Sequence, residues 1–255
     1  MSERIEALES SAAHLSSLVR GLALEQLDDQ SYASQWSIAQ VLSHLGSGAV
    51  IMRRGVDVTV SGEAVEDGLN QSVWDEWSAK APEAKAADAL VADRALLDRL
   101  DAVSDDDRAS FQFSMGPMTL DFDRFLTMRL SEHVLHTWDI DVTIHPDAML
   151  PDDAVPFVLD VLPMITGFVG QSDGNEGVVA IRTATPDRVF QLAVGPERLE
   201  LALATDWAAE PADGDVELSS EESVRLVYGR LDPAHTSPSA AGPALDRLRK
   251  LFPGL

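Results

Sequence analysis

Hydrophobic residues recur at helical spacing through much of the first 150 residues. The first such segment covers residues 3–27, where apolar positions repeat every three or four residues. The second has a start signal, because Ser37 and Gln40 match a capping box and Trp36 occupies the outer position of a hydrophobic staple. We predict helices over about residues 3–27, 37–54, 83–103 and 120–144.

The connections between these helices carry turn signals. Gly62 and Gly68 interrupt residues 55–82, which we predict to be irregular. The run Ser104-Asp105-Asp106-Asp107 is predicted to end the third helix, and Met115-Gly116-Pro117 predicts a turn before the fourth. Four helices with short and long connections predict a four-helix bundle.

The pattern changes beyond about residue 150. Residues 154–169 are predicted to be helical despite two prolines, and after Gly177 the apolar residues follow the spacing of strands. The predicted strands are 178–181, 189–194, 199–203 and 216–218, and the predicted helices that follow are 219–226 and 244–252. The predicted fold class is therefore α+β, with a helical domain over residues 1–150 and a small α+β domain over residues 151–255.

The composition limits the classes of partner. Asp and Glu total 43 and Lys and Arg 19, which gives a formal net charge of −24. A surface this acidic repels nucleic acid and anionic membranes, so we expect neither as a partner. The charged N-terminus does not resemble a signal peptide, and no apolar run reaches the ~18–20 residues that span a bilayer. We therefore expect a cytoplasmic protein, and the absence of coiled-coil heptads favours a monomer.

The chain contains no cysteine. Disulfides, cysteine-ligated zinc sites and a cysteine nucleophile are therefore excluded. Thiol chemistry would need a thiol on a cosubstrate.

One predicted helix carries a carboxylate and an imidazole one turn apart. At ~100° per residue, Glu132 and His136 share one face, and Asp139 lies one turn further along it. His133 points ~100° away and is expected to be exposed. Burying these groups would be costly without a strong partner, and a bound cation is such a partner. The alternative is a buried Glu–His pair with Arg129, one turn earlier, as its counter-ion.

A second histidine supports the metal interpretation. His44 lies in the middle of the second predicted helix, in an apolar context. A lone histidine there is more often a core residue. Two helices that each direct a ligand-type side chain into one bundle core instead favour a metal site. Trp74 and Trp77 are interpreted as packing residues.

These motifs resemble those of a known family. Residues 36–45, together with the pattern R-x-x-E-x-x-x-H-x-x-D over residues 129–139, resemble the mycothiol-dependent maleylpyruvate isomerase family. That family belongs to the DinB-like superfamily of metal-binding four-helix bundles. The C-terminal region is similar to its second domain, in Val227-Tyr228-Gly229-Arg230 and in residues 245–254.

The resemblance implies that His44, Glu132 and His136 bind a divalent metal, with zinc preferred. Asp139 would orient His136 or act as a further ligand. Three protein ligands leave one position open for water or substrate. The thiol of mycothiol would bind there and lose its proton. It would then add to a conjugated double bond, and rotation followed by elimination would give the trans isomer.

The expected function is a metal-dependent, mycothiol-using enzyme, either an isomerase of maleylpyruvate type or a thiol S-transferase, with a small-molecule substrate. Arg230, Asn70 and Arg129 are candidates for binding substrate or thiol, although Arg230 fits a surface arginine and Asn70 a loop cap equally well. Two alternatives remain open: a DinB-like hydrolase that uses metal-bound water, and a non-catalytic protein that binds metal or a small ligand. A fourth protein ligand would favour a structural site.

Overall fold

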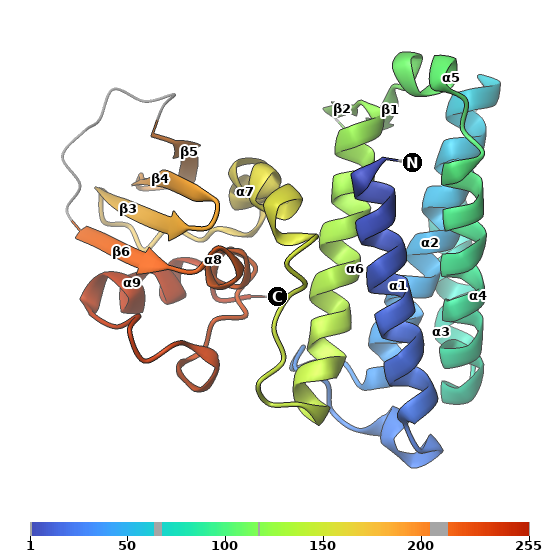
Figure 1. Ribbon diagram of the computed structural model, residues 1–255, viewed down its shortest axis with the longest axis horizontal. Coiled ribbons are helices and arrows are strands. Elements are labelled where there is room, and N and C mark those ends of the chain that lie inside the picture. The colour runs from blue at the N-terminus through green and yellow to red at the C-terminus, as the bar shows by residue number, and fades with distance from the viewer. Residues whose placement is uncertain (1, 64–67, 117, 205–213, 255) are drawn as a thin grey trace. The chain divides into compact units, whose positions relative to one another are not determined.

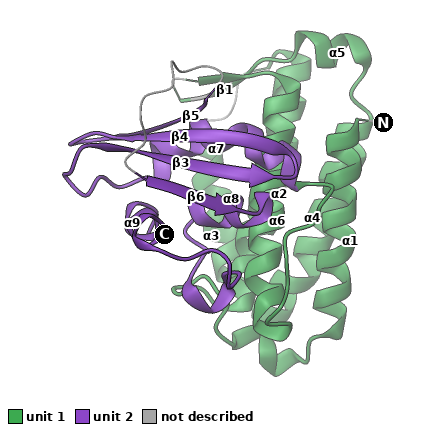
Figure 2. Ribbon diagram, turned by 60° about the vertical axis from the view of Figure 1, so that its left-hand side comes forward, with its two compact units in different colours: residues 1–154 green, residues 155–255 purple. Residues whose placement is uncertain are grey.

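The computed structural model of the 255-residue chain (Figure 1) describes residues 2–63, 68–116, 118–204 and 214–254. The chain divides into two compact units, an N-terminal unit of residues 1–154 and a C-terminal unit of residues 155–255 (Figure 2). Helices dominate the first unit, and the second combines helices with a four-stranded sheet, so the predicted α+β class is confirmed. Among the described residues, no helix combines the length and apolar character needed to cross a bilayer.

Four long helices form most of the N-terminal unit. They are α1 (Glu3–Gly21), α2 (Ile38–Ser61), α4 (Pro82–Asp101) and α6 (Phe122–Ile144). Both α1 and α2 pack against α4 and α6, so the four helices surround one core, which includes Leu15, Leu42, Leu96 and Phe125. The shorter elements are η1 (Leu24–Asp28), α3 (Leu69–Ala79), α5 (Asp105–Ser110), β1 (Phe113–Met115) and β2 (Met118–Leu120).

Helix α2 begins where the sequence predicts. The Ser37 side chain accepts the backbone N–H of Gln40, and the Gln40 side chain accepts that of Ser37 at 2.8 Å, which confirms the predicted capping box. The helix continues past its predicted end. It contains Gly55 because a Cβ there would lie 2.7 Å from the Phe113 ring. Glycine at this position therefore allows close packing and does not mark a break.

The segment of residues 55–82, predicted to be irregular, is mostly helical in its described part. It contains the end of α2 and the whole of α3. Gly62 and Gly68 both have left-handed φ angles, at 72° and 76°, and flank helix ends. They mark two helix boundaries and not one long loop. Trp77 of α3 is buried, as predicted for a packing residue, whereas Trp74 is 47% exposed.

Two short elements also differ from the prediction. Ser104, expected to end a helix, caps α5 by accepting the backbone N–H of Asp107 at 3.1 Å. Strands β1 and β2 form an antiparallel hairpin where only a turn was predicted. Pro117 of that turn lies outside the described residues. Three-residue strands are too short to show an alternating pattern in the sequence.

The C-terminal unit is built on a sheet with the strand order β5-β4-β3-β6. Its strands are β3 (Gly177–Ala184), β4 (Asp187–Val194), β5 (Leu199–Leu203) and β6 (Gly214–Leu218), antiparallel except for the parallel pair β3–β6. The helical elements are α7 (Val155–Val169), α8 (Ser220–Val227), η2 (Pro233–His235) and α9 (Pro243–Leu251). Helix α7 contacts β5 and α8, and α9 contacts β6. The predicted order of strands and helices in this region is confirmed.

Candidate metal centre

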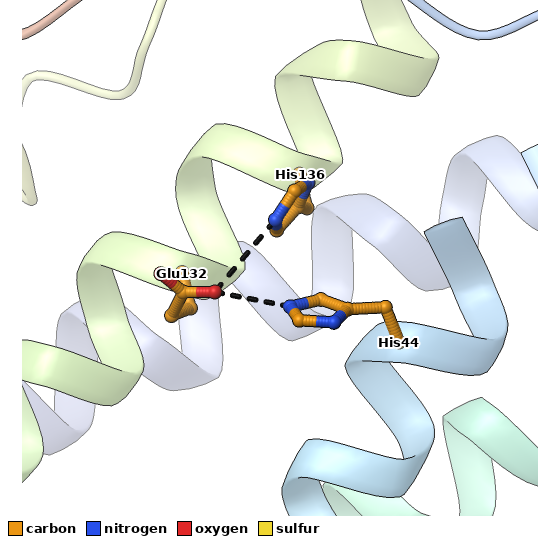
Figure 3. A group of neighbouring side chains, drawn as sticks. All are labelled: His44, Glu132 and His136. Carbon is orange, nitrogen blue, oxygen red and sulfur yellow. Dashed lines mark hydrogen bonds and ion pairs between the residues drawn. The ribbon is translucent and has the colours of Figure 1, made fainter. Parts of the chain in front are cut away.

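Three predicted ligands converge between α2 and α6 (Figure 3). His44 lies on α2, and Glu132 and His136 lie one turn apart on α6. One ligand atom from each lies within 4.8 Å of the other two. His44 Nε2 is 3.0 Å from Glu132 Oε2, and His136 Nε2 is 3.7 Å from the same oxygen. Two imidazole nitrogens and a carboxylate oxygen form a donor set that suits zinc in an open site.

Helix geometry and core packing explain this convergence. The four-residue spacing of Glu132 and His136 places both side chains on one face of α6. Leu45 and Leu135, the sequence neighbours of His44 and His136, are fully buried. Their burial fixes both helices in the core at the level of the ligands.

The cluster is partly accessible to solvent. The side chains of His44 and Glu132 are 37% and 38% exposed, and that of His136 is 12% exposed. A small molecule could therefore reach this group of donors.

A buried carboxylate orients one of the imidazoles. The side chain of Asp139 is fully buried, and its Oδ2 lies 2.8 Å from His136 Nδ1. When the carboxylate accepts the Nδ1–H, the ring presents Nε2 to Glu132. Within the described residues, the converging group comprises His44, Glu132 and His136 without Asp139. Asp139 thus has the geometry of a group that holds a ligand.

An indole ring lies beside two of the converging side chains. The Trp36 ring centroid is 5.0 Å from that of His44 and 5.5 Å from that of His136. The two imidazoles are 4.6 Å apart, edge to face. The indole thus restricts both rings. The sequence placed Trp36 in a hydrophobic staple and in the family motif, but it did not predict a place beside the ligands, because a residue that precedes the helix has no place in a helical periodicity.

The prediction that His133 is exposed is wrong. Its side chain is 1% exposed, with Nε2 3.1 Å from Asp93 Oδ2 and Nδ1 2.8 Å from Ser11 Oγ. Ser11 lies on α1 and Asp93 on α4, and α1 packs against α6. Helical periodicity gives the direction of a side chain but not what covers it, so it could not identify these partners.

Arg129 is also buried, with a side-chain exposure of 3%. Its Nη2 donates to Asp93 and to the carbonyl oxygen of Leu45, the latter at 3.0 Å. The partner of this guanidinium is therefore Asp93. The alternative to a metal site, in which Arg129 is the counter-ion of the Glu132–His136 pair, is wrong on this point. Its burial also argues against contact with a substrate. We call Ser11, Asp93, Arg129 and His133 the Asp93 network.

Asp93 is ionised within this network. Burial alone would raise the pKa of its carboxyl group, but the interactions with His133 and Arg129 outweigh burial and lower the pKa below its usual value. The network is thus a buried ion pair with further hydrogen bonds. No signal in the sequence indicated Asp93, because its partners lie on other helices.

Two further candidates lie elsewhere in the chain. Asn70 is exposed in the first turn of α3, where Gly68 and not Asn70 occupies the N-cap. Arg230 belongs to the C-terminal unit, and its Nη1 donates to the carbonyl oxygen of Tyr228 at 2.9 Å. Binding roles for these two residues stay predictions.

A protein-family model, that of the mycothiol maleylpyruvate isomerase N-terminal domain, matches residues 8–141 of this chain. This match spans more than half of the chain and includes every residue of the converging group. The chain belongs to the mycothiol maleylpyruvate isomerase family. The resemblance inferred from the sequence is therefore confirmed.

Solved structures agree with the family assignment. The chain is similar to a crystal structure of the mycothiol-dependent maleylpyruvate isomerase, with a TM-score of 0.65 and 16% identity over 94% of this chain and 95% of that chain. A mutant of that isomerase with one histidine replaced by alanine gives the same values. Among curated proteins, none matches the sequence significantly. At this identity the likeness shows a shared fold.

Proposed function

We propose that this member of the family is a metal-dependent, mycothiol-using enzyme of the maleylpyruvate isomerase type. The observation that carries the proposal is the convergence of His44, Glu132 and His136. Two imidazoles and a carboxylate would favour zinc among the common divalent metals and would leave a position for water or a cosubstrate. The activity of the similar solved isomerase supports the same reaction class.

The surrounding residues support this role. Glu132 supplies negative charge against a cation, Asp139 holds the His136 ring, and Trp36 lies against both imidazoles. A bound divalent metal would promote loss of the proton from a thiol beside it. Because the chain has no cysteine, that thiol would belong to the cosubstrate.

The proposal extends to both parts of the chain. The helices α1, α2, α4 and α6 would form a DinB-like four-helix bundle, and residues 1–150 the metal-binding domain. Residues 151–255 would form the α+β C-terminal domain of the family. Arg230 is the cation that we assign to an anionic substrate or to the thiol, since a chain with a net charge of −24 needs a local positive group to attract an anion.

The isomerase and transferase forms of the proposal differ in the fate of the thiol. In isomerisation, the thiolate adds to a conjugated double bond, the resulting single bond rotates, and elimination restores the free thiol. In transfer, the new carbon–sulfur bond persists in the product. The thiol is therefore regenerated in the first reaction and consumed in the second.

The deciding experiment combines zinc-loaded protein, mycothiol and maleylpyruvate, and measures isomer, thioether and free thiol together. We expect turnover to require both metal and thiol. His44→Ala should abolish it, whereas His14→Ala, which removes an exposed histidine paired with Asp141, should not. Isomer without thiol loss identifies the isomerase, and a stable conjugate identifies the transferase.

Two other outcomes would contradict the proposal. Hydrolysis of an ester or amide by zinc-loaded protein without thiol would favour the hydrolase. Metal binding with neither thiol binding nor turnover would favour a non-catalytic binding protein. Calorimetry in buffers of different ionisation enthalpy gives an independent measure, because thiol binding should release about one proton per site.

A further inference from the structure

The Asp93 network joins all four long helices. Ser11 comes from α1, Asp93 from α4, and Arg129 and His133 from α6. Arg129 also donates to the carbonyl oxygen of Leu45 on α2, at 3.0 Å. The four polar residues are each at most 4% exposed. The buried guanidinium of Arg129, on α6, therefore connects the backbone of α2 to a side chain of α4.

This connection lies next to the converging ligands in the sequence. Leu45 directly follows His44, and His133 directly follows Glu132. Arg129 precedes Glu132 by one helical turn. The contact of His44 Nε2 with Glu132 Oε2, at 3.0 Å, depends on the register of α2 against α6. The bond from Arg129 to the Leu45 carbonyl fixes the same two helices at this level.

Stability alone does not account for the network. A buried ion pair is often no more stabilising than apolar side chains of similar volume, because both charges lose their hydration. Arg129 Nε, moreover, is buried and has no hydrogen-bond partner among the described residues. A guanidinium bound in this way instead fixes one geometry, which is the best-attested benefit of buried polar groups.

Gly48 provides the space for the guanidinium. A Cβ built at Gly48 would lie 3.1 Å from Arg129 Nη1. Outside the adjacent helix backbone, no other described atom lies within 4 Å of it. Glycine inside a helix is less favourable than alanine, so its presence here fits a requirement of Arg129 for room.

We propose that Asp93 and Arg129 are positioning residues of the metal centre. They set the register of α2 against α6, so that His44 meets Glu132 and His136. Arg129 acts through the backbone of Leu45, and Asp93 acts by holding Arg129. The inference rests on the proposed metal site.

The test compares cobalt binding to variants of the full chain, through the dissociation constant and the visible absorption of the bound ion. Asp93→Asn removes the charge that holds Arg129 while keeping the size of the side chain. We expect cobalt to bind roughly 10-fold more weakly, with an altered absorption band. Leu100→Ala is the control for a loss of stability that does not touch the network. Leu100 is buried on α4, seven residues from Asp93. That variant should keep the wild-type affinity and spectrum.

Gly48→Ala keeps the test decisive if Asp93→Asn does not fold. The new methyl group would lie 3.1 Å from Arg129 Nη1 and press the guanidinium a few tenths of an ångström out of place, while alanine favours the helix. We expect cobalt affinity to fall about threefold or more without a lower melting temperature. Disturbing the hydrogen bonds behind metal ligands weakens metal binding in this way. The matched control is Gly21→Ala on α1, where a Cβ meets nothing within 4 Å. This control should bind cobalt like the wild type.

The outcomes separate this inference from the proposed function. If the wild-type chain binds cobalt and His44→Ala does not, the metal site stands. Wild-type affinity and spectrum in Gly48→Ala and in folded Asp93→Asn would then overturn the positioning role alone. If the wild-type chain binds no cobalt through His44, both the site and the positioning role are overturned.

Discussion

Helix α6 carries two sets of polar side chains on neighbouring faces. Glu132 and His136 form part of a partly accessible cluster with His44, and the exposed fraction of Glu132 is 38%. Arg129 and His133 belong instead to the Asp93 network, where each charged or imidazole group is almost fully buried. A carboxylate and at least one imidazole thus occur in both places.

The difference lies in what surrounds these groups. The network is enclosed by other helices and supplies its own counter-charge, because Asp93 faces Arg129. The accessible cluster gathers two imidazoles around one carboxylate and can present its donors to an external cation. Residue type alone therefore does not distinguish a ligand-binding face from an internal connection. Accessibility to solvent and the source of the counter-charge distinguish the two.

The largest expected effect is the loss of metal from the accessible face. The wild-type protein should carry about one divalent ion per chain, and the double substitution His44→Ala and His136→Ala should remove it. Elemental analysis of the purified proteins measures the content. His145→Ala, which removes an exposed histidine paired with Asp141, should retain the ion. Full metal content in the double variant would show that the ion binds elsewhere.

The next effect concerns the enclosed face. Asp93→Ala leaves the Arg129 guanidinium buried without its carboxylate, so we expect a loss of about 3–5 kcal/mol in the free energy of unfolding of metal-free protein. Urea unfolding followed by circular dichroism measures it. Asp93→Leu combined with Arg129→Met removes both charges and should recover much of this loss. A decrease below ~1 kcal/mol for Asp93→Ala would mean that the pair contributes as little as a surface ion pair.

Asp139 combines features of the two faces, since it is buried but bonds His136 of the accessible cluster. Asp139→Asn should keep the metal and weaken its binding ~10–100-fold, because the ring loses its charged acceptor. A competition titration with a chelator measures the affinity, and the cobalt spectrum separates a changed ligand set from a reoriented ligand. Complete loss of metal would instead make Asp139 a direct ligand and favour a structural site.

The smallest effect is a difference in salt response between a buried and an exposed carboxylate. Hydrogen bonds from Arg247 and from the backbone of Asn175 lower the pKa of the exposed Asp173 carboxyl group to about 2. The pKa of Asp93 is also lowered, but this carboxyl group is buried. Raising the salt concentration to about 1 M should move the pKa of Asp173 upward and leave that of Asp93 almost unchanged. Carboxyl carbon resonances followed by NMR report both values. Equal shifts would show that solvent screens the network.

These lowered pKa values also fix the direction of the pH dependence. Each carboxylate stabilises the folded chain fully above its unfolded pKa. That contribution is lost as the pH falls from the unfolded pKa through the lower folded value.

Local signals in the sequence predicted much of the fold. The predicted capping box of Ser37 and Gln40 is complete within four residues. At the start of α8, where only a helix start was predicted, Ser219 and Glu222 form a box with the same spacing. Both depend on neighbours along the chain, which a sequence shows directly. Helix α3 was missed because the glycines at the adjoining helix ends were interpreted as one loop.

The candidate site was predictable to a different extent. The four-residue spacing of Glu132 and His136 is visible in one helix, and the family motifs supplied the pairing with His44. The burial of His133 and its bond to Asp93 depend on contacts between residues 40 positions apart. The packing of α1 against α4 and α6 brings these residues together.

The contact between Gly46 and Trp77 has a consequence for local unfolding. A Cβ at Gly46 would lie 2.2 Å from the Trp77 ring, so the indole rests directly on α2. Among the residues of α3, only Val73 and Trp77 are buried, and the Ser43 hydroxyl donates to the Trp77 carbonyl at 3.2 Å. A helix held by so few contacts can open without disturbing the four long helices. We therefore expect amide hydrogens of α3 to exchange with solvent through a local opening, well before those of α6.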